Sequence, residues 1–64
     1  MIEIISKDKM QEIIRNPLLD INKGKYTVID DDQFICVDNS SGSAYQKIFI
    51  SIIDVVKWFN GMLT

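Results

Sequence analysis

The chain has 64 residues, of which 47% are hydrophobic and 25% charged, and its formal net charge is −2. That composition is typical of an ordered globular domain and differs from that of a disordered chain. The seven Lys and Arg residues are scattered singly, so they form no stripe that could neutralise a phosphate backbone. The composition therefore argues against a nucleic-acid-binding protein.

A domain this small needs reinforcement, because a chain of about 60 residues buries only about 60% of its unfolded surface. The sequence has one cysteine and no histidine, which excludes an intramolecular disulfide and a Cys/His zinc site. Oligomerisation remains as the means of stabilisation. The amino end carries Glu3 where a secretion signal would be basic, and no run reaches the roughly 18 apolar residues of a membrane span. We expect one domain over residues 1–64, in the cytoplasm and without a membrane partner.

A first helix is predicted to follow Ser6. Ser6 is a suitable N-cap, Asp8 places a negative charge in the first turn, and Met10, Ile13 and Ile14 form an apolar stripe. This pattern predicts a short amphipathic helix that packs on the rest of the fold.

Pro17 sets the end of that helix. It disfavours the helical conformation at Asn16, so the helix should end by Arg15, and Asn16 could cap one further turn that begins at Pro17. Residues 1–5 fit either a short edge strand or an extension of the helix, and the sequence leaves both open.

Three strands are predicted after Gly24, over Lys25–Ile29, Gln33–Val37 and Ala44–Ile50, because these segments are rich in aromatic and β-branched residues. The connections between them carry Asp, Asn, Ser and Gly, the residue types of tight turns. The predicted fold class is therefore α+β: an N-terminal helix, a three-stranded antiparallel β-meander and a C-terminal helix packed on the sheet.

Both faces of this sheet are predicted to be apolar. Phe34 and Cys36 point away from Ile35, and Tyr45 points away from Ile48. If both helices cover one face, the other needs another subunit; alternatively, the first helix crosses over and covers it in a monomer.

The C-terminal helix is predicted to begin after Ser51, its N-cap, and to end at Gly61. Most of its apolar residues fall on one arc, but Ile53 and Trp58 lie outside that arc on opposite flanks. Trp58 has two interpretations that stay open: a buried tryptophan with a partnered indole N–H, or an anchor at an interface, where tryptophan is enriched. We take Trp58, Ile53 and Tyr45 as candidate partner-binding residues.

The acidic run Asp30, Asp31 and Asp32 is predicted to form the first hairpin turn. It does not match an EF-hand loop, since the sixth and twelfth positions counted from Asp30 hold Ile35 and Ser41. The run is either a solvated turn or an acidic patch that steers the protein toward a basic partner.

No catalytic residues or cofactor are predicted. Cys36 lies in the middle of a strand without a histidine that could lower its pKa, and the serines lie in a turn without a base.

The stretch from Phe34 to Tyr45, followed by Phe49, Ser51 and the helix ending Val56-Lys57-Trp58-Phe59-Asn60-Gly61, resembles small proteins encoded by phages and prophages of Gram-positive bacteria. In those proteins a strand runs into Val-Asp-Asn, and a Gly-bearing turn, an aromatic strand and a short helix follow. The resemblance covers the C-terminal half and implies a mobile-element accessory protein, a class that includes non-enzymatic inhibitors of bacterial immune systems.

These observations predict a non-enzymatic protein–protein interaction module that acts as a homodimer and inhibits a bacterial defence protein in the host cytoplasm. Its expected contacts are Trp58, Ile53, Tyr45 and the acids of residues 30–32. The alternative is a metal- or small-ligand-responsive regulatory module that uses the same acidic loop, residues 30–32.

Overall fold

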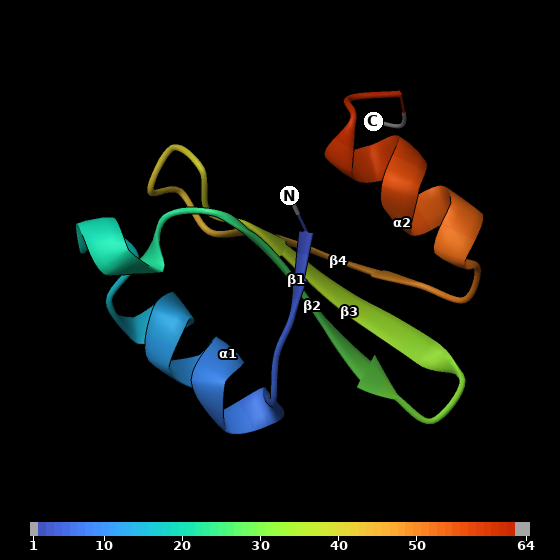
Figure 1. The fold of residues 1–64 in the computed structure, drawn as a ribbon, viewed down its shortest axis with the longest axis horizontal. Helices are drawn as coiled ribbons and strands as arrows, with labels where there is room; N and C mark the ends of the chain where they lie inside the picture. The colour runs from blue at the N-terminus through green and yellow to red at the C-terminus, as the bar shows by residue number, and fades with distance from the viewer. Residues whose placement is uncertain (1, 63–64) are drawn as a thin grey trace.

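A computed structural model describes residues 2–62 and shows an α+β fold with two helices and a four-stranded mixed sheet (Figure 1). In chain order, the elements are β1 (Ile2–Ile4), α1 (Lys7–Arg15), the 3₁₀ turn η1 (Asp20–Asn22), β2 (Lys25–Asp30), β3 (Gln33–Asp38), β4 (Tyr45–Phe49) and α2 (Ile52–Phe59). None of the helices within residues 2–62 is long and apolar enough to cross a membrane.

The sheet has one strand more than predicted. Its order is β1-β2-β3-β4, and β1 pairs with β2 in parallel, with Ile4 beside Thr27. The purely antiparallel three-stranded meander is therefore wrong in this detail. The pairing is parallel because α1 carries the chain back along the sheet between β1 and β2, as a crossover connection must. The open question about residues 1–5 resolves as a strand over Ile2–Ile4.

The three predicted strands do form antiparallel hairpins, β2 with β3 and β3 with β4. The first hairpin turns at Asp31 and Asp32, and Asp31 adopts a φ of 55°, in the left-handed region that Asp tolerates better than most residues. The register places Ile35 opposite Ile48 and Phe34 opposite Phe49, so the predicted alternation of side chains on these strands is confirmed.

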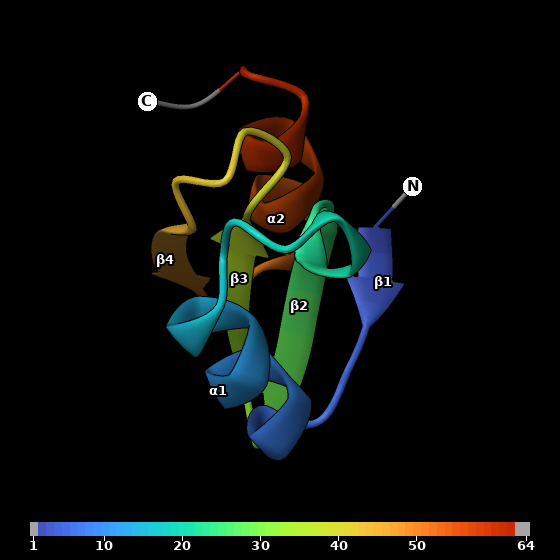
Figure 2. The same ribbon diagram turned by 90° about the vertical axis from the view of Figure 1, so that its left-hand side faces the viewer.

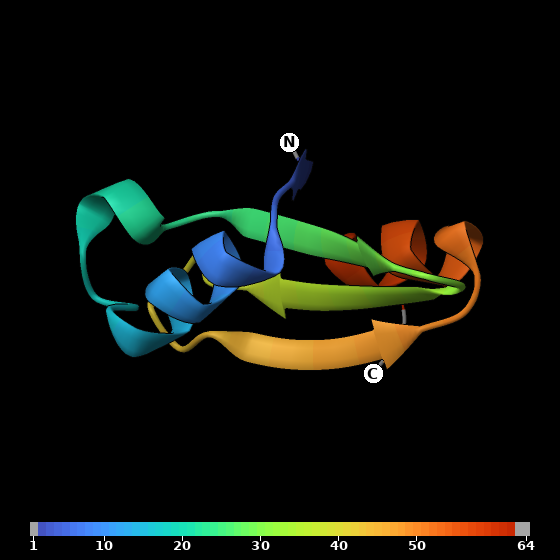
Figure 3. The same ribbon diagram turned by 90° about the horizontal axis from the view of Figure 1, so that it is seen from below.

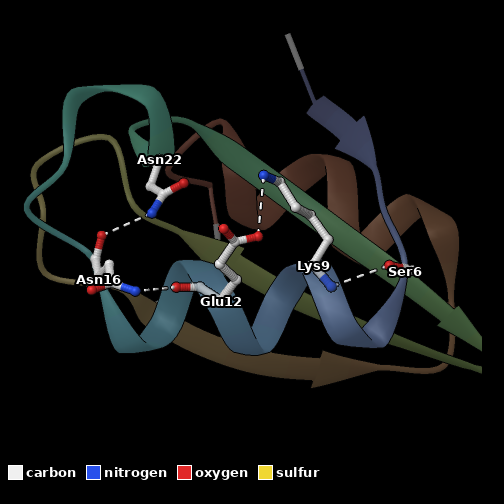
Figure 4. Close-up of polar contacts among 5 residues, drawn as sticks. All are labelled: Ser6, Lys9, Glu12, Asn16 and Asn22. Atoms are coloured by element: carbon white, nitrogen blue, oxygen red, sulfur yellow. Dashed lines mark hydrogen bonds and ion pairs between the residues drawn. The ribbon is translucent and has the colours of Figure 1, made fainter.

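Helix α1 has the predicted ends. The Ser6 hydroxyl accepts a hydrogen bond from the backbone N–H of Lys9 at 3.1 Å, and the helix ends at Arg15 with Asn16 as its C-cap (Figure 4). Lys9 and Glu12 form an ion pair of 3.5 Å along the exposed side. The further turn expected at Pro17 does form, at Pro17 and Leu18, where the N–H of Leu19 donates to the carbonyl of Asn16 at 3.3 Å; the separate 3₁₀ turn η1 follows it.

The two helices lie on opposite faces of the sheet (Figures 2 and 3). On the face that we call the α1 face, Met10 and Ile13 join Tyr26, Val28 and Val37 in one buried cluster. On the other face, the α2 face, the buried cluster consists of Cys36, Val55 and Phe59. The crossover arrangement is thus the observed one, and each face has a helix of its own.

Candidate functional site: apolar surfaces around the sheet

The helices cover the sheet incompletely, because one helix of eight or nine residues is narrower than four strands. Large apolar side chains stay exposed on the sheet, on α2 and in the loops, and they are Ile4, Leu18, Leu19, Ile21, Ile29, Tyr45, Ile48, Ile50, Ile52, Ile53, Val56 and Met62. Single exposed apolar residues are common on protein surfaces, whereas contiguous groups mark interaction sites. The question is therefore which of these side chains lie together.

Two of them share the α2 face at the β1 side of the sheet. Ile4 stands beside Thr27 in the parallel register, and Thr27 in turn lies opposite Cys36, which packs under α2. Ile29 is two residues farther along β2 and therefore points to the same face. Both side chains are more than half exposed, so α2 does not reach over them.

Helix α2 turns an apolar flank toward this uncovered part of the sheet. Val55 and Phe59 face the sheet, and Trp58 lies over β4, since its ring centroid is 5.9 Å from that of Phe49. At 100° per residue, Ile52 and Val56 fall on the flank opposite Trp58, which faces β2 and β1. We call the group Ile4, Ile29, Ile52, Ile53 and Val56 the α2 surface. Ile53 is turned about 160° from Val55 on the helix, so it points away from the sheet.

Trp58 is partly buried and packs against the core beneath α2. It is half-buried, and its ring packs on Phe49 and, at 5.0 Å, on Phe59, so it contributes to the core beneath α2. Tyr45 is exposed on the same face of β4, near the opposite end of the strand. Trp58 and Tyr45 therefore lie on the β4 side of α2, whereas Ile53 belongs to the α2 surface.

The acidic residues lie elsewhere. Asp30 ends β2 and pairs with Lys7 at 2.9 Å, while Asp31 and Asp32 form the exposed turn. Tyr45 lies opposite Asp38, at the other end of β3, about 17 Å away at the usual rise per residue. The predicted contact residues are thus spread over separate regions, and among residues 2–62 no group of three or more Cys, Asp or Glu side chains could hold a metal ion.

A third apolar group was not anticipated. The connection from α1 to β2 exposes Leu18, Leu19 and Ile21, which we call the loop surface. Beside it lies a shallow pocket of about 270 Å³, lined by Arg15, Asn16, Pro17, Leu18 and Leu19. The only sequence signal for this surface is its run of apolar residues directly after a proline.

Two buried asparagines hold the loop surface in place. The Asn39 side-chain amide donates to the carbonyl oxygens of Pro17 at 2.9 Å and Asn22 at 2.8 Å, and its oxygen accepts from the N–H of Ala44 at 3.0 Å. The Asn22 amide donates to the carbonyl of Asn16 at 2.9 Å (Figure 4). These bonds satisfy backbone groups that an irregular segment would otherwise leave unpaired. The sequence indicated turns here, but turn residues do not reveal such long-range contacts.

The single cysteine is part of the core. Cys36 is fully buried, its sulfur lies 3.1 Å from the Thr27 hydroxyl, and burial raises the pKa of its thiol while the contact with Thr27 opposes that rise. A buried thiol with a raised pKa is a poor nucleophile. Cys36 therefore fills space in the core beneath α2, beside Val55 and Phe59.

Comparisons with known proteins add no family assignment: no protein-family model, no curated protein and no solved structure matches this chain significantly.

Proposed function

We propose that this protein is a non-enzymatic protein–protein interaction module that acts as a homodimer and binds a protein of its host through the α2 surface. The observation that carries the proposal is that five aliphatic side chains stay uncovered around the α2 face: Ile4 and Ile29 on the sheet, and Ile52, Ile53 and Val56 on α2. Each is between 45% and 68% exposed. In view of the resemblance to phage accessory proteins, we propose a bacterial defence protein as the target.

The size of the α2 surface is consistent with a binding role. Full burial of one large aliphatic side chain stabilises by about 1.5–3 kcal/mol, so covering the exposed parts of these five would contribute about 4–8 kcal/mol before the costs of association. Association costs about 4 kcal/mol or more, so this contribution alone does not reach the roughly 8 kcal/mol of a micromolar complex, and rim contacts would have to supply the rest. The acidic turn, which carries Asp31 and Asp32, would favour a partner with a basic rim.

The chemistry of the chain supports binding rather than catalysis. Its one thiol is buried with a raised pKa, and its serines in residues 40–43 bond to Asp38 or to one another. Asp38 accepts from the Ser40 hydroxyl at 2.6 Å and from the Ser40 backbone N–H at 3.1 Å, so this carboxylate and hydroxyl form a local Asx turn.

The test is a pull-down from a host lysate with Ile53→Glu as the variant and Ile21→Glu as the matched control. Ile53 lies in the first turn of α2, where the helix dipole tolerates an acid, so the variant should fold normally. Ile21 is similarly exposed but belongs to the loop surface. We expect the wild type and Ile21→Glu to recover the same partner, and Ile53→Glu to lose it. Equal recovery by both variants would remove the α2 surface from the proposal, and a failure of the wild type to enrich any partner would contradict the function itself.

A further inference from the structure

Strand β4 ends the sheet with an open edge. It has five residues, contains no proline, and pairs with β3 in an unbroken register from Tyr45 to Phe49. Natural proteins protect such edges with proline, bulges, several charges or a covering loop. The only charged residue in β4 is Lys47, so the edge has little of this protection. The other edge strand, β1, is only three residues long.

The hydrogen bonds of the sheet show which backbone groups of β4 face outward. The N–H of Asn39 donates to the carbonyl of Gly24 at 2.7 Å, and the N–H of Ile5 donates to that of Thr27 at 2.9 Å. Along an antiparallel strand, residues bond alternately to the neighbour on one side and to the neighbour on the other. Both contacts imply that the odd-numbered residues of β3 bond to β2, so the even-numbered residues of β3 bond to β4. Their partners in β4 are the odd-numbered residues, so the N–H and C=O groups of Gln46 and Ile48 point away from the sheet.

We propose that β4 pairs antiparallel with β4 of a second copy, with Ile48 opposite the partner's Ile48 at the two-fold axis. The inference deepens the proposed homodimer and rests on it. In this pairing Gln46 bonds across to the partner's Ile50, and Lys47 lies opposite the partner's Phe49. The outward groups of Gln46 and Ile48 are then all used.

Charge and existing hydrogen bonds exclude two other registers. A dimer centred on Lys47 would put two lysines directly opposite each other, at a Cα distance of about 4.5 Å, and like charges in that position are destabilising. A dimer centred on Gln46 would need the N–H of Ala44, which already donates to the Asn39 side chain at 3.0 Å. Centring the axis on Ile48 avoids both conflicts.

The side chains beside the edge are those that the monomer leaves uncovered. Ile48 is 58% exposed on the α1 face, Tyr45 is 64% exposed on the α2 face, and Ile50 directly after β4 is 78% exposed. At roughly 100 Å² of exposed surface each, three such residues from two copies supply on the order of 600 Å². The backbone edge and the β4 side of α2, with Trp58, bring the contact toward the range of about 1,200–2,000 Å² of stable dimers.

Single cysteine variants test the register. Cys36 is fully buried, so each variant adds one accessible thiol. Across the axis, paired Ile48 residues would have Cα atoms about 5.5 Å apart, within disulfide range, whereas Lys47 would meet the partner's Lys47 only diagonally at about 7–8 Å. Under mild oxidation we expect Ile48→Cys to form a covalent dimer at least about tenfold faster than Lys47→Cys or Ile53→Cys. Faster crosslinking of Lys47→Cys would overturn the register, and faster crosslinking of Ile53→Cys would move the dimer contact to α2.

Sedimentation at micromolar concentration separates this inference from the proposed function. We expect the wild type and Ile21→Lys to be dimers, and Ile48→Lys to raise the dimer dissociation constant at least about tenfold through lysine–lysine repulsion at the axis. Circular dichroism establishes that each variant is folded. A dimeric Ile48→Lys would overturn the β4 contact and leave the homodimer in place. A monomeric wild type would overturn both, while partner recovery in the pull-down would still stand on the α2 surface.

Discussion

Replacing Asn39 with alanine is expected to destabilise this protein strongly, although Asn39 lies outside all helices and strands. Its side chain is fully buried and makes three hydrogen bonds to backbone groups, namely the carbonyls of Pro17 and Asn22 and the N–H of Ala44. These bonds connect the loop surface to the β3–β4 connection. The substitution leaves all three backbone groups without their partner and opens a small cavity.

The cost can be worked out from these bonds. A buried polar group left unsatisfied costs about 1–3 kcal/mol, and partial access of water to the loop reduces the sum, so we expect a loss of about 3–5 kcal/mol for Asn39→Ala. At about 0.05–0.15 kcal/mol per residue, the total stability of a 64-residue domain is about 3–10 kcal/mol. The matched control is Asn16→Ala, which removes one exposed hydrogen bond of 3.3 Å to the Glu12 carbonyl and should cost less than about 1 kcal/mol.

Urea unfolding followed by circular dichroism measures both variants. Protein concentration must be the same throughout, because dimerisation adds to the apparent stability. We expect Asn39→Ala to have a urea midpoint far below that of Asn16→Ala. If both variants lose the same small amount, the amide network does not hold the loop and the reasoning from these bonds is refuted.

Two further predictions concern the core beneath α2. Val55 is fully buried, whereas Val56 is exposed at the α2 surface. Val55→Ala should therefore lower the free energy of unfolding by about 2 kcal/mol, and Val56→Ala by about 0.5 kcal/mol. Equal losses in thermal melts would contradict the assigned orientation of α2. Burial raises the pKa of the Cys36 thiol in the folded state. The stability that the protonated thiol contributes is therefore present below the pKa of the unfolded state, about 8.5, and is lost as pH rises through the pKa of the folded state. The wild type should therefore lose more stability than Cys36→Ala between pH 7 and pH 10 in urea titrations, and parallel losses would show that the thiol does not titrate differently in the two states.

Local signals in the sequence were sufficient for most elements of the fold. Ser6 and Ser51 as N-caps, Pro17 after the first helix and Gly61 after the second act within one or two turns, so the helix bounds follow from the nearby chain. The alternation along β3 and β4 likewise gave the correct faces for Phe34 and Ile48. The α+β class follows from these local patterns.

The pairing of β1 could not be decided in this way. Three residues fit a strand or a helix equally well, and their place beside β2 depends on α1 carrying the chain back across the sheet. The same crossover puts α1 and α2 on opposite faces. Because the sequence does not predict this crossover, it does not predict how much apolar surface of the sheet a monomer can cover.

The candidate surfaces, too, were predictable from the sequence only in part. An excess of apolar side chains for so small a domain was evident from composition and from Ile53 and Trp58 lying off the apolar arc of α2. Only the tertiary structure decided that Ile4 and Ile29 stay uncovered on the α2 face, that Trp58 packs on Phe49, and that Asn39 holds the loop surface. Periodicity specifies which way a side chain points within its own element, whereas contact between elements depends on how the chain crosses the sheet, and that requires the folded structure.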